Sequence, residues 1–320
     1  MLRGGWLMIV DRRKFLKTAA VAGVVGAVAG NARLDWAAES APGSFDFVFF
    51  TDTHIEPELN APTGCEMCFG KIAGLKPEFA VMGGDHVYDA LGVDGARAGT
   101  VFDLYKKTQL ALEMPIHNVI GNHDVFGILT KSGVAPSDPA YGKKMYEDRM
   151  GKTYYSFDHK GYHFVVLDSI QPTEDRMWEA RVDEKQVSWL AEDLKSAGAR
   201  TPVIVIVHVP LVTAFATWAA DRMRTGDKYD TLSVANAPQV IGAFEGHNVI
   251  AVLQGHTHVN EIVDYKNTKY ITSGAVCGNW WHGPRMGFAE GFTVVSLREG
   301  KINTRYETYG FKSVDPREKF

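Results

Sequence analysis

Four short polar stretches and one single histidine each follow directly on an apolar run of this sequence. The first is Gly121-Asn122-His123-Asp124, and the others are Asp52-Thr53-His54, Gly84-Asp85, His208 and Gly255-His256-Thr257-His258. An apolar run that stops and then offers carboxylate, imidazole and amide groups is typical of a strand that delivers a reactive loop. Asp52 and His54 stand two residues apart, so on an extended segment both side chains project to the same side and can reach one ion.

These residue types suit a metal ion. Imidazole and carboxylate together favour Mn²⁺, Fe or Zn²⁺, and the absence of cysteine from the set argues against a soft thiolate site. Each part alone has a simpler explanation, because Asp-x-His can be a turn and a lone histidine is more often a satisfied core residue. Five His, one Asn and, besides Asp124, two Asp at the ends of five apolar runs favour convergence instead, since strand ends on one edge of a sheet are where α/β enzymes build their sites.

The apolar runs read as strands that alternate with helical patterns. Expected strands cover residues 45–50, 79–82, 115–120, 201–207 and 248–253, and expected helices cover about 96–112, 138–150 and 183–197. This alternation predicts an α/β layered fold. A hairpin is expected over residues 153–158 and 162–168, and three later strands, at 269–273, 291–297 and 301–308, are expected to complete one sheet.

The ordered motifs resemble those of the calcineurin-like metallophosphoesterase superfamily over about residues 45–260. The resemblance implies a four-layer αββα sandwich, in which two mixed β-sheets are flanked by helices. It also implies a site for two metal ions (Mn, Fe or Zn). Carried over by position, the ligands of the first metal would be Asp52, His54 and His258. The ligands of the second metal would be Asn122, His208 and His256. Asp85 would bridge the two metals. His123 would stay off the metals and act on the substrate, oriented by a nearby carboxylate such as Asp124.

The reaction implied by the resemblance is hydrolysis of a phosphoester. Two ions about 3.5 to 4 Å apart share a bridging hydroxide, whose parent water is acidified toward a pKa near 7. A protonated His123 would donate to the departing alkoxide, a contribution of about 10²- to 10⁴-fold. The expected substrate is a small organic phosphodiester, such as a cyclic nucleotide or a nucleotide-like metabolite, with a phosphomonoester as the alternative. A non-catalytic metal-binding module is a further alternative, against which the intact His123 argues.

Three aromatic residues are candidates for contact with the substrate. Tyr88 stands where the purple acid phosphatases place a ferric ligand, but His54 belongs to a different branch, so we expect His54 to ligate and Tyr88 to pack or line the pocket. Trp280 and Trp281 lie on a Gly- and Pro-rich loop, which predicts a stacking wall for a base, sugar or aromatic leaving group. A lid packed against the domain is the alternative interpretation of that loop.

Composition and charge narrow the classes of partner. The chain of 320 residues is 45% hydrophobic and 22% charged, which is ordinary for a globular protein. Beyond residue 40 it has 28 Lys and Arg against 35 Asp and Glu, with no basic patch, so a nucleic-acid polymer is not expected as a partner. We expect one catalytic domain over residues 44–310 and a tail over 311–320.

The N-terminal forty residues resemble a twin-arginine export signal. Arg12 and Arg13 precede a weakly apolar run over residues 18–30, which is too short for a confident membrane span. The expected partner is therefore the twin-arginine export machinery, with a periplasmic or otherwise exported location, and membrane anchoring only if the leader is not cleaved. Cys65 and Cys68 are one turn apart near a helix expected to run to about Gly74, and neither they nor Cys277 predict a disulfide framework.

Overall fold

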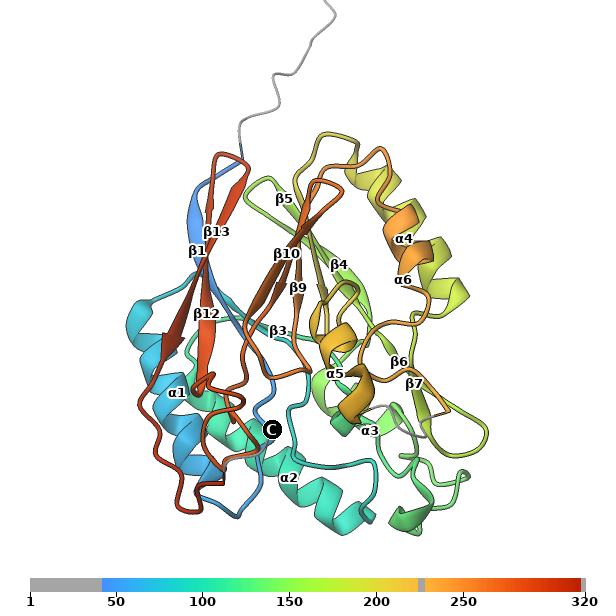
Figure 1. The fold of residues 1–320 in the computed structure, drawn as a ribbon, viewed down its shortest axis with the longest axis vertical. Coiled ribbons are helices and arrows are strands. Elements are labelled where there is room, and N and C mark those ends of the chain that lie inside the picture. The colour runs from blue at the N-terminus through green and yellow to red at the C-terminus, as the bar shows by residue number, and fades with distance from the viewer. Residues whose placement is uncertain (1–41, 224–227, 318–320) are drawn as a thin grey trace, which may run out of the picture. The chain divides into compact units, whose positions relative to one another are not determined.

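Two β-sheets face each other in the computed structural model, which describes residues 42–223 and 228–317 (Figure 1). The first sheet has five strands in the order β13-β12-β1-β2-β3, and its three consecutive neighbours β1, β2 and β3 are parallel. Its strands are β1 (Phe45–Phe50), β2 (Ala80–Met82), β3 (Ile116–Asn118), β12 (Gly291–Arg298) and β13 (Lys301–Thr308). Because β12 runs antiparallel to both β1 and β13, the sheet is mixed.

The second sheet has six strands in the order β10-β11-β9-β8-β5-β4. Its strands are β4 (Tyr155–His159), β5 (Tyr162–Leu167), β8 (Val203–Val207), β9 (Val249–Gln254), β10 (Glu261–Tyr265) and β11 (Thr268–Thr272). The central four are parallel, and the edge strands β4 and β10 pair antiparallel with their neighbours. A separate two-stranded sheet pairs β6 (Ile170–Pro172) with β7 (Trp178–Ala180).

Helices cover the outer faces of both sheets (Figure 1). The helices α1 (Ala61–Leu75) and α2 (Gly95–Thr108) lie on the side of the first sheet, where Phe50 of β1 packs against Phe69 of α1 with ring centroids 5.4 Å apart. On the side of the second sheet lie α4 (Glu184–Ala197) and α6 (Ala237–Gly242), and the remaining α-helices of the described residues are α3 (Lys144–Met150) and α5 (Phe215–Met223). The predicted α/β fold, with two mixed sheets flanked by helices, is confirmed.

The central strands are apolar throughout because both of their faces are buried. On β1, Phe45, Phe47 and Phe49 point into the core between the sheets, while Val48 and Phe50 point toward the helices. Phe47 meets Phe164 of the other sheet with ring centroids 5.7 Å apart. Strands buried on both sides read as continuous hydrophobic runs, which is the pattern that made them visible in the sequence.

Some expected elements differ in the structure. The three late strands do not complete one sheet, since β11 pairs with β9 in the second sheet whereas β12 and β13 extend the first. The helix expected over residues 138–150 is shorter, because Asp138 accepts a hydrogen bond from the Ala140 amide and holds a turn, and α3 begins only at Lys144. The hairpin of β4 and β5 and the helix α4, capped by Asp183, formed as expected.

The structure describes the C-terminal end of the chain to residue 317 but not the N-terminal end before residue 42. The export signal expected over residues 1–40 lies outside the described residues and stays a prediction. Within the described residues, no helix is long and apolar enough to span a bilayer. Residues 311–317 of the stretch expected as a tail pack on the loop before β12, where Phe311 contacts the ring of Trp281 at 5.0 Å and the Arg317 amide donates to the carbonyl of His282.

A buried histidine joins the second sheet to its covering helix. His163 of β5 places Nδ1 2.7 Å from Asp158 and Nε2 2.8 Å from Asp193 of α4. Burial alone would lower the pKa of His163, but the two carboxylates more than offset burial and raise the pKa. Asp158 is 80% exposed at its side chain, so Asp193 at 15% is the stronger partner.

We expect His163→Gln to destabilise the protein more at pH 5 than at pH 9. Because the pKa of His163 is higher in the folded than in the unfolded protein, its protonation stabilises the fold. This stabilisation is fully present below the unfolded-state pKa of about 6.5 and is lost as the pH rises through the folded-state pKa. The charged hydrogen bond is worth about 1 to 3 kcal/mol at pH 5. Urea denaturation of both proteins at the two pH values measures the difference, and an equal loss at both would show that the charge of His163 is not its cause.

Candidate metal centre

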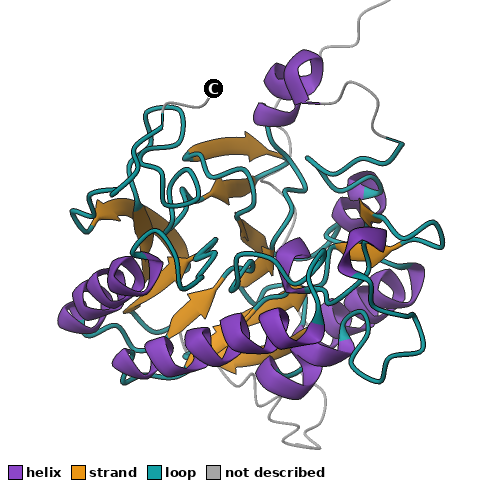
Figure 2. Ribbon diagram, turned by 90° about the horizontal axis from the view of Figure 1, so that it is seen from below, coloured by secondary structure: helices purple, strands orange, loops and turns teal. Residues whose placement is uncertain are grey.

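The predicted site residues come together at one edge of the two sheets. Each lies on a loop that follows the carboxyl end of a strand: β1, β2 and β3 in the first sheet, β8 and β9 in the second. Figure 2, seen from below Figure 1, looks onto these loops. Parallel strands end at the same edge of a sheet, so five segments that are far apart in the sequence deliver their polar groups to one place.

The first cluster consists of Asp52, His54 and His258. Nε2 of His54 lies 3.2 Å from Nε2 of His258, and Oδ1 of Asp52 lies 3.3 Å from Nε2 of His258 and 3.8 Å from Nε2 of His54. All three side chains are buried. Three ligand atoms this close together, from a carboxylate and two imidazoles, are a donor set that can hold a divalent ion.

The second cluster consists of Asp85, His208 and His256, each of which offers a ligand atom within 4.8 Å of the others. Oδ2 of Asp85 lies 3.2 Å from Nε2 of His208 and 3.4 Å from Nε2 of His54 in the first cluster. Asp85 therefore faces both clusters, which is the position that the sequence predicted for a bridging ligand. Asn122 is buried on the adjacent loop after β3.

Several atoms of this centre are buried without a hydrogen-bond partner among the described residues. They are Oδ1 of Asp52, Nδ1 of His54, Oδ1 of Asn122, Nε2 of His208 and Nδ1 of His256. Buried polar atoms are nearly always paired, because an unpaired one costs about 1 to 3 kcal/mol. Their concentration at one place fits the binding of metal ions, which all of these atoms except Nδ1 of His54 would coordinate, since His54 turns Nε2 toward the cluster.

The opposite ring nitrogens of three histidines are held by backbone carbonyls. His208 Nδ1 donates to Gly83 O at 2.8 Å, His256 Nε2 to Thr231 O at 2.8 Å and His258 Nδ1 to Gly278 O at 2.6 Å. Such a bond fixes the tautomer and leaves the other nitrogen as the acceptor that a metal requires. His256 also donates its backbone N–H to Oδ2 of Asp52 at 3.0 Å, which ties the loop after β9 to the loop after β1.

Burial and mutual charge shift the pKa values of His208, His256, Asp52 and Asp85. Burial lowers the pKa of His208, but Asp85 and Asp52 more than offset it and raise the pKa to about 9, whereas burial and the charge of His208 lower the pKa of His256 to about 3. Burial would raise the pKa of both Asp52 and Asp85, yet the surrounding imidazoles hold it well below the usual range. The two carboxylates are thus anionic at neutral pH, as a cation site needs.

The backbone of the centre is strained and tightly packed. Five residues of the two clusters have φ in the left-handed region: Asp52, His54, Asp85, His256 and His258. Gly84 has φ +105°, and a Cβ on Gly121 would lie 2.2 Å from the Asp85 amide nitrogen. Left-handed non-glycine residues cluster at functional sites, where the surrounding structure enforces them. The glycines recognised in the sequence let the two loops approach each other this closely.

His123 is oriented differently from the prediction. Its Nδ1 lies 2.5 Å from the carbonyl of Tyr88 and its backbone N–H donates to Oδ1 of Asp85 at 2.8 Å. Asp124 does not orient the imidazole, so that part of the prediction was wrong. The carbonyl of Tyr88 does so instead, a backbone role that no side-chain pattern could indicate.

Asp124 accepts hydrogen bonds from two loops and so holds them together. Its Oδ2 accepts from the backbone N–H of Asp85 at 3.0 Å and of Gly121 at 2.9 Å and lies 2.9 Å from Nδ1 of His86, while its Oδ1 accepts from the His86 amide at 2.8 Å. Nε2 of His86 faces Oδ1 of Asn118 at 3.1 Å. Asp124 and His86 thus fix the loops that carry Asp85, Asn122 and His123, and His86 stands behind the centre.

The paired tryptophans have separate positions. Trp281 is fully buried, its Nε1 donates to the carbonyl of His54 at 3.0 Å, and its ring fills the space left by Gly64. It cannot stack on a substrate, so the prediction was wrong for this residue. Trp280 is partly exposed, with its ring centroid 4.7 Å from that of His258. Tyr88 is half-buried, 6.4 Å from the His54 ring, so its side chain lies beside the centre.

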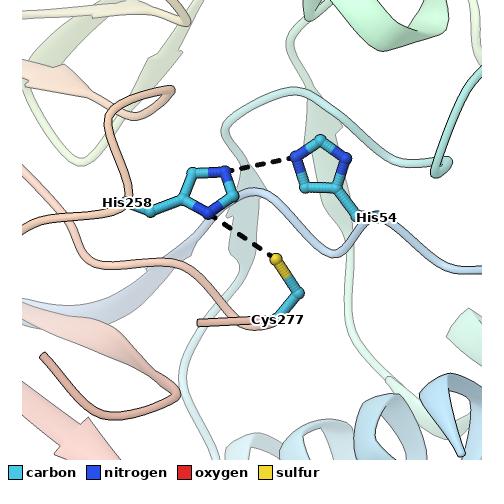
Figure 3. A group of neighbouring side chains, drawn as sticks. All are labelled: His54, His258 and Cys277. Carbon is cyan, nitrogen blue, oxygen red and sulfur yellow. Dashed lines mark hydrogen bonds between the residues drawn. The ribbon is translucent and has the colours of Figure 1, made fainter. Parts of the chain in front are cut away.

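Cys277 was missed as a neighbour of the centre. Its Sγ lies 3.8 Å from Nδ1 of His258, and Figure 3 shows the thiol, His258 and His54 in one group. Burial raises the pKa of Cys277 well above its usual value, so the group is a thiol rather than a thiolate. Cys277 is fully buried, and the sequence carried no signal for its place beside His258.

A family model described as calcineurin-like phosphoesterase matches residues 45–260, which contain every strand-end motif of the centre. The chain belongs to this family. The His and Asp clusters are those of a dimetal phosphoesterase, and the protein is a hydrolase.

Two curated relatives are both described as serine/threonine-protein phosphatase CPPED1. The protein of Bos taurus is 28% identical over 235 residues, which cover 72% of this chain and 67% of the relative. The protein of Rattus norvegicus is 28% identical over the same length and is covered to 68%.

Two solved structures show the same fold. A dimetal phosphatase from Danio rerio matches with a TM-score of 0.57 at 15% identity, covering 83% of this chain and 99% of that one. A purple acid phosphatase from yellow lupin matches with a TM-score of 0.55 at 13% identity, covering 84% of this chain and 52% of that one. At such identities the likeness concerns the fold alone.

We expect Asp124→Asn to lower both stability and metal content. The amide nitrogen would face backbone N–H groups that now donate to the carboxylate, and each donor left unpaired costs about 1 to 3 kcal/mol. The loops that carry Asp85 and Asn122 would then separate. Thermal unfolding and elemental analysis of the purified protein measure the two effects.

Asp183→Asn is the matched control for this prediction. Asp183 caps α4 by accepting from the Gln186 amide, and Asn serves equally well at this position. The control should keep the wild-type melting temperature and metal content. If Asp124→Asn does so too, Asp124 does not hold the loops together.

Proposed function

We propose that this hydrolase cleaves a phosphoester with two metal ions, one in each cluster. The single observation that carries the proposal is the place of Asp85, whose Oδ2 lies within 3.4 Å of His54 in one cluster and within 3.2 Å of His208 in the other. One carboxylate between two sets of imidazoles is the arrangement that a pair of ions requires. The proposed ligands are Asp52, His54, Asp85, Asn122, His208, His256 and His258.

Two bound ions would supply an acidified water and neutralise the charge of the phosphoryl group. Borderline or hard ions such as Mn²⁺, Fe or Zn²⁺ suit the imidazole and carboxylate donors. The protein supplies the positions: the carboxylate of Asp85 is fixed by the His123 amide, and Asp52 is fixed by the His256 amide and the hydroxyl of Thr51 at 2.7 Å. The charges are thereby preorganised before substrate binds.

His123 is proposed as the proton donor to the leaving group. Its Nδ1 is engaged by the Tyr88 carbonyl, so Nε2 is the nitrogen available to the substrate, and its ring lies at the edge of His54 with centroids 4.6 Å apart. The alternative is that His123 is itself a ligand, because it can offer an atom within 4.8 Å of ligand atoms of His54 and Asp85.

Two classes of phosphoester are candidate substrates. The sequence-based expectation is a small phosphodiester, whereas both curated relatives are described as serine/threonine-protein phosphatases, which supports a monoester. We therefore propose phosphomonoesters as the first class to examine. A diester preference is the second candidate.

The purified protein, loaded in turn with Mn²⁺, Fe and Zn²⁺, should hydrolyse p-nitrophenyl phosphate faster than bis-p-nitrophenyl phosphate. The release of p-nitrophenolate measures both rates, and metal content is determined on the same samples. A faster diester reaction would reverse the proposed preference. Two bound ions without turnover of either ester would contradict the enzymatic proposal and favour a metal-containing binding module.

We expect His123→Ala to keep about two ions per chain and to lower kcat by about 10²- to 10⁴-fold, the usual contribution of a general acid. The loss should be largest for alkyl phosphates, because p-nitrophenolate leaves without protonation. His247→Ala, before β9 at the opposite end of that strand, is the control and should leave both quantities unchanged. Loss of one ion from His123→Ala would instead identify His123 as a ligand.

A further inference from the structure

Arg285 is a buried cation beside the metal centre. It is only 5% exposed, and its Nε is buried without a hydrogen-bond partner. Across residues 42–223 and 228–317, no carboxylate forms an ion pair with it, and even Glu290, equally buried on the same loop, lies beyond ion-pair distance. Buried charges are usually paired, because removing a charge from water without a partner costs several kcal/mol.

Trp280 holds this cation next to the clusters. The Arg285 guanidinium carbon lies 5.3 Å from the centroid of the Trp280 ring, and the same ring lies 4.7 Å from that of His258 and 5.9 Å from that of His54. Arg285 and the two proposed ligands His54 and His258 therefore lie around the same indole ring. A cation–π contact offsets only part of the cost of burying the charge, about 0.5 to 2 kcal/mol.

The backbone around Arg285 is fixed rather than free. Arg285 and Phe288 exchange both backbone hydrogen bonds at 2.9 Å, and Met286 and Phe288 pack on the cluster that includes Phe215 of α5 and Val259. At the other end of the loop, the buried Trp281 is tied to the carbonyl of His54. The backbone that carries Arg285 is thus preorganised for a partner, as that of a recognition residue should be.

The positive charge of Arg285 and of the proposed metal ions indicates the chemical class of its partner. Two divalent ions in the clusters would repel a nearby guanidinium, so the arrangement is favourable only if an anion lies between them. Guanidinium binds carboxylate and phosphate oxygens through two parallel hydrogen bonds, and it is the preferred group for phosphate recognition. The imidazoles of His54 and His258, which lie around the same Trp280 ring, are not carboxylates and supply no such anion.

We propose that Arg285, supported by Trp280, is an oxyanion subsite that binds an anionic oxygen of the substrate. This inference rests on the proposed phosphoesterase function and assigns a recognition residue to it. The oxygen belongs either to the phosphoryl group that is cleaved or to a second anionic group of the same molecule. Trp280 accordingly supports the arginine, in place of the free stacking wall expected from the sequence.

Calorimetric titration of the Mn²⁺-loaded protein tests the subsite with two probes, inorganic phosphate and phosphonoacetate. Arg285→Met should raise the Kd for the probe by about 10- to 100-fold, the loss of one charge-assisted pair. Arg285→Lys should restore part of the affinity, since it keeps the charge and loses the fork. Arg305→Met is the matched control, because Arg305 is exposed on β13 and pairs with Glu307.

The two probes separate the two sources of the anion. A weaker phosphate complex identifies the cleaved phosphoryl group, and weaker binding of phosphonoacetate alone identifies a second anionic group. Unchanged affinity for both probes in Arg285→Met and Arg285→Lys would overturn the proposal. Because binding is measured directly, the result holds even if the wild-type protein turns over neither nitrophenyl ester, which would contradict the proposed function separately.

Thermal unfolding in phosphate-free buffer distinguishes recognition from packing. Removing an unpaired buried charge while keeping an apolar stem should leave the melting temperature of Arg285→Met unchanged or raise it, as for residues kept for binding. A residue that only packs against Trp280 would give a lower melting temperature and an unchanged Kd. That combination would also overturn the subsite.

Discussion

The carboxylate of Asp124 is the constraint on which the centre depends. It accepts hydrogen bonds from backbone groups of both the loop after β2 and the loop after β3, and it does so with no exposure to solvent. Hydrogen bonds to an ionised group in a low-dielectric interior are strong and directional. Asp85 faces both clusters, and the His123 amide reaches Asp85, because this one side chain fixes the distance between the two loops.

The strained backbone and unpaired polar atoms of the centre destabilise the fold, and the packing of the two sheets supplies the stability that offsets this cost. Left-handed backbone at five cluster residues and several unpaired buried atoms are each unfavourable by about 1 to 3 kcal/mol. Behind them lies an aromatic core between the sheets, in which Phe47, Phe79 and Phe164 contact one another with centroids 4.9 to 5.7 Å apart. Strain at a site persists only where rigid surroundings enforce it, and metal binding would relieve part of it by pairing the free atoms.

The sequence predicted what is local and missed what depends on tertiary packing. The apolar run that became β8 and the motif after β9 are visible because a buried strand is apolar along its length and the polar residue that follows it stands out. The partner of β11 was misassigned, since strand pairing depends on contacts far away in the sequence. Asp124 was read as a neighbour of His123 from adjacency alone, whereas its side chain turns toward His86.

The loop between β11 and β12 explains how substrate recognition can vary while the ligands stay fixed. It leaves the second sheet and enters the first, so it crosses the edge where both sheets present their clusters. Trp281 anchors it through the His54 carbonyl and the space above Gly64, and the neighbouring Trp280 carries Arg285 beside the histidines. Since none of the proposed ligands lies on this loop, substitutions there would change which anion is bound without removing a metal-binding atom. In the proposed arrangement, recognition by this loop is separated from metal binding by the loops at the strand ends.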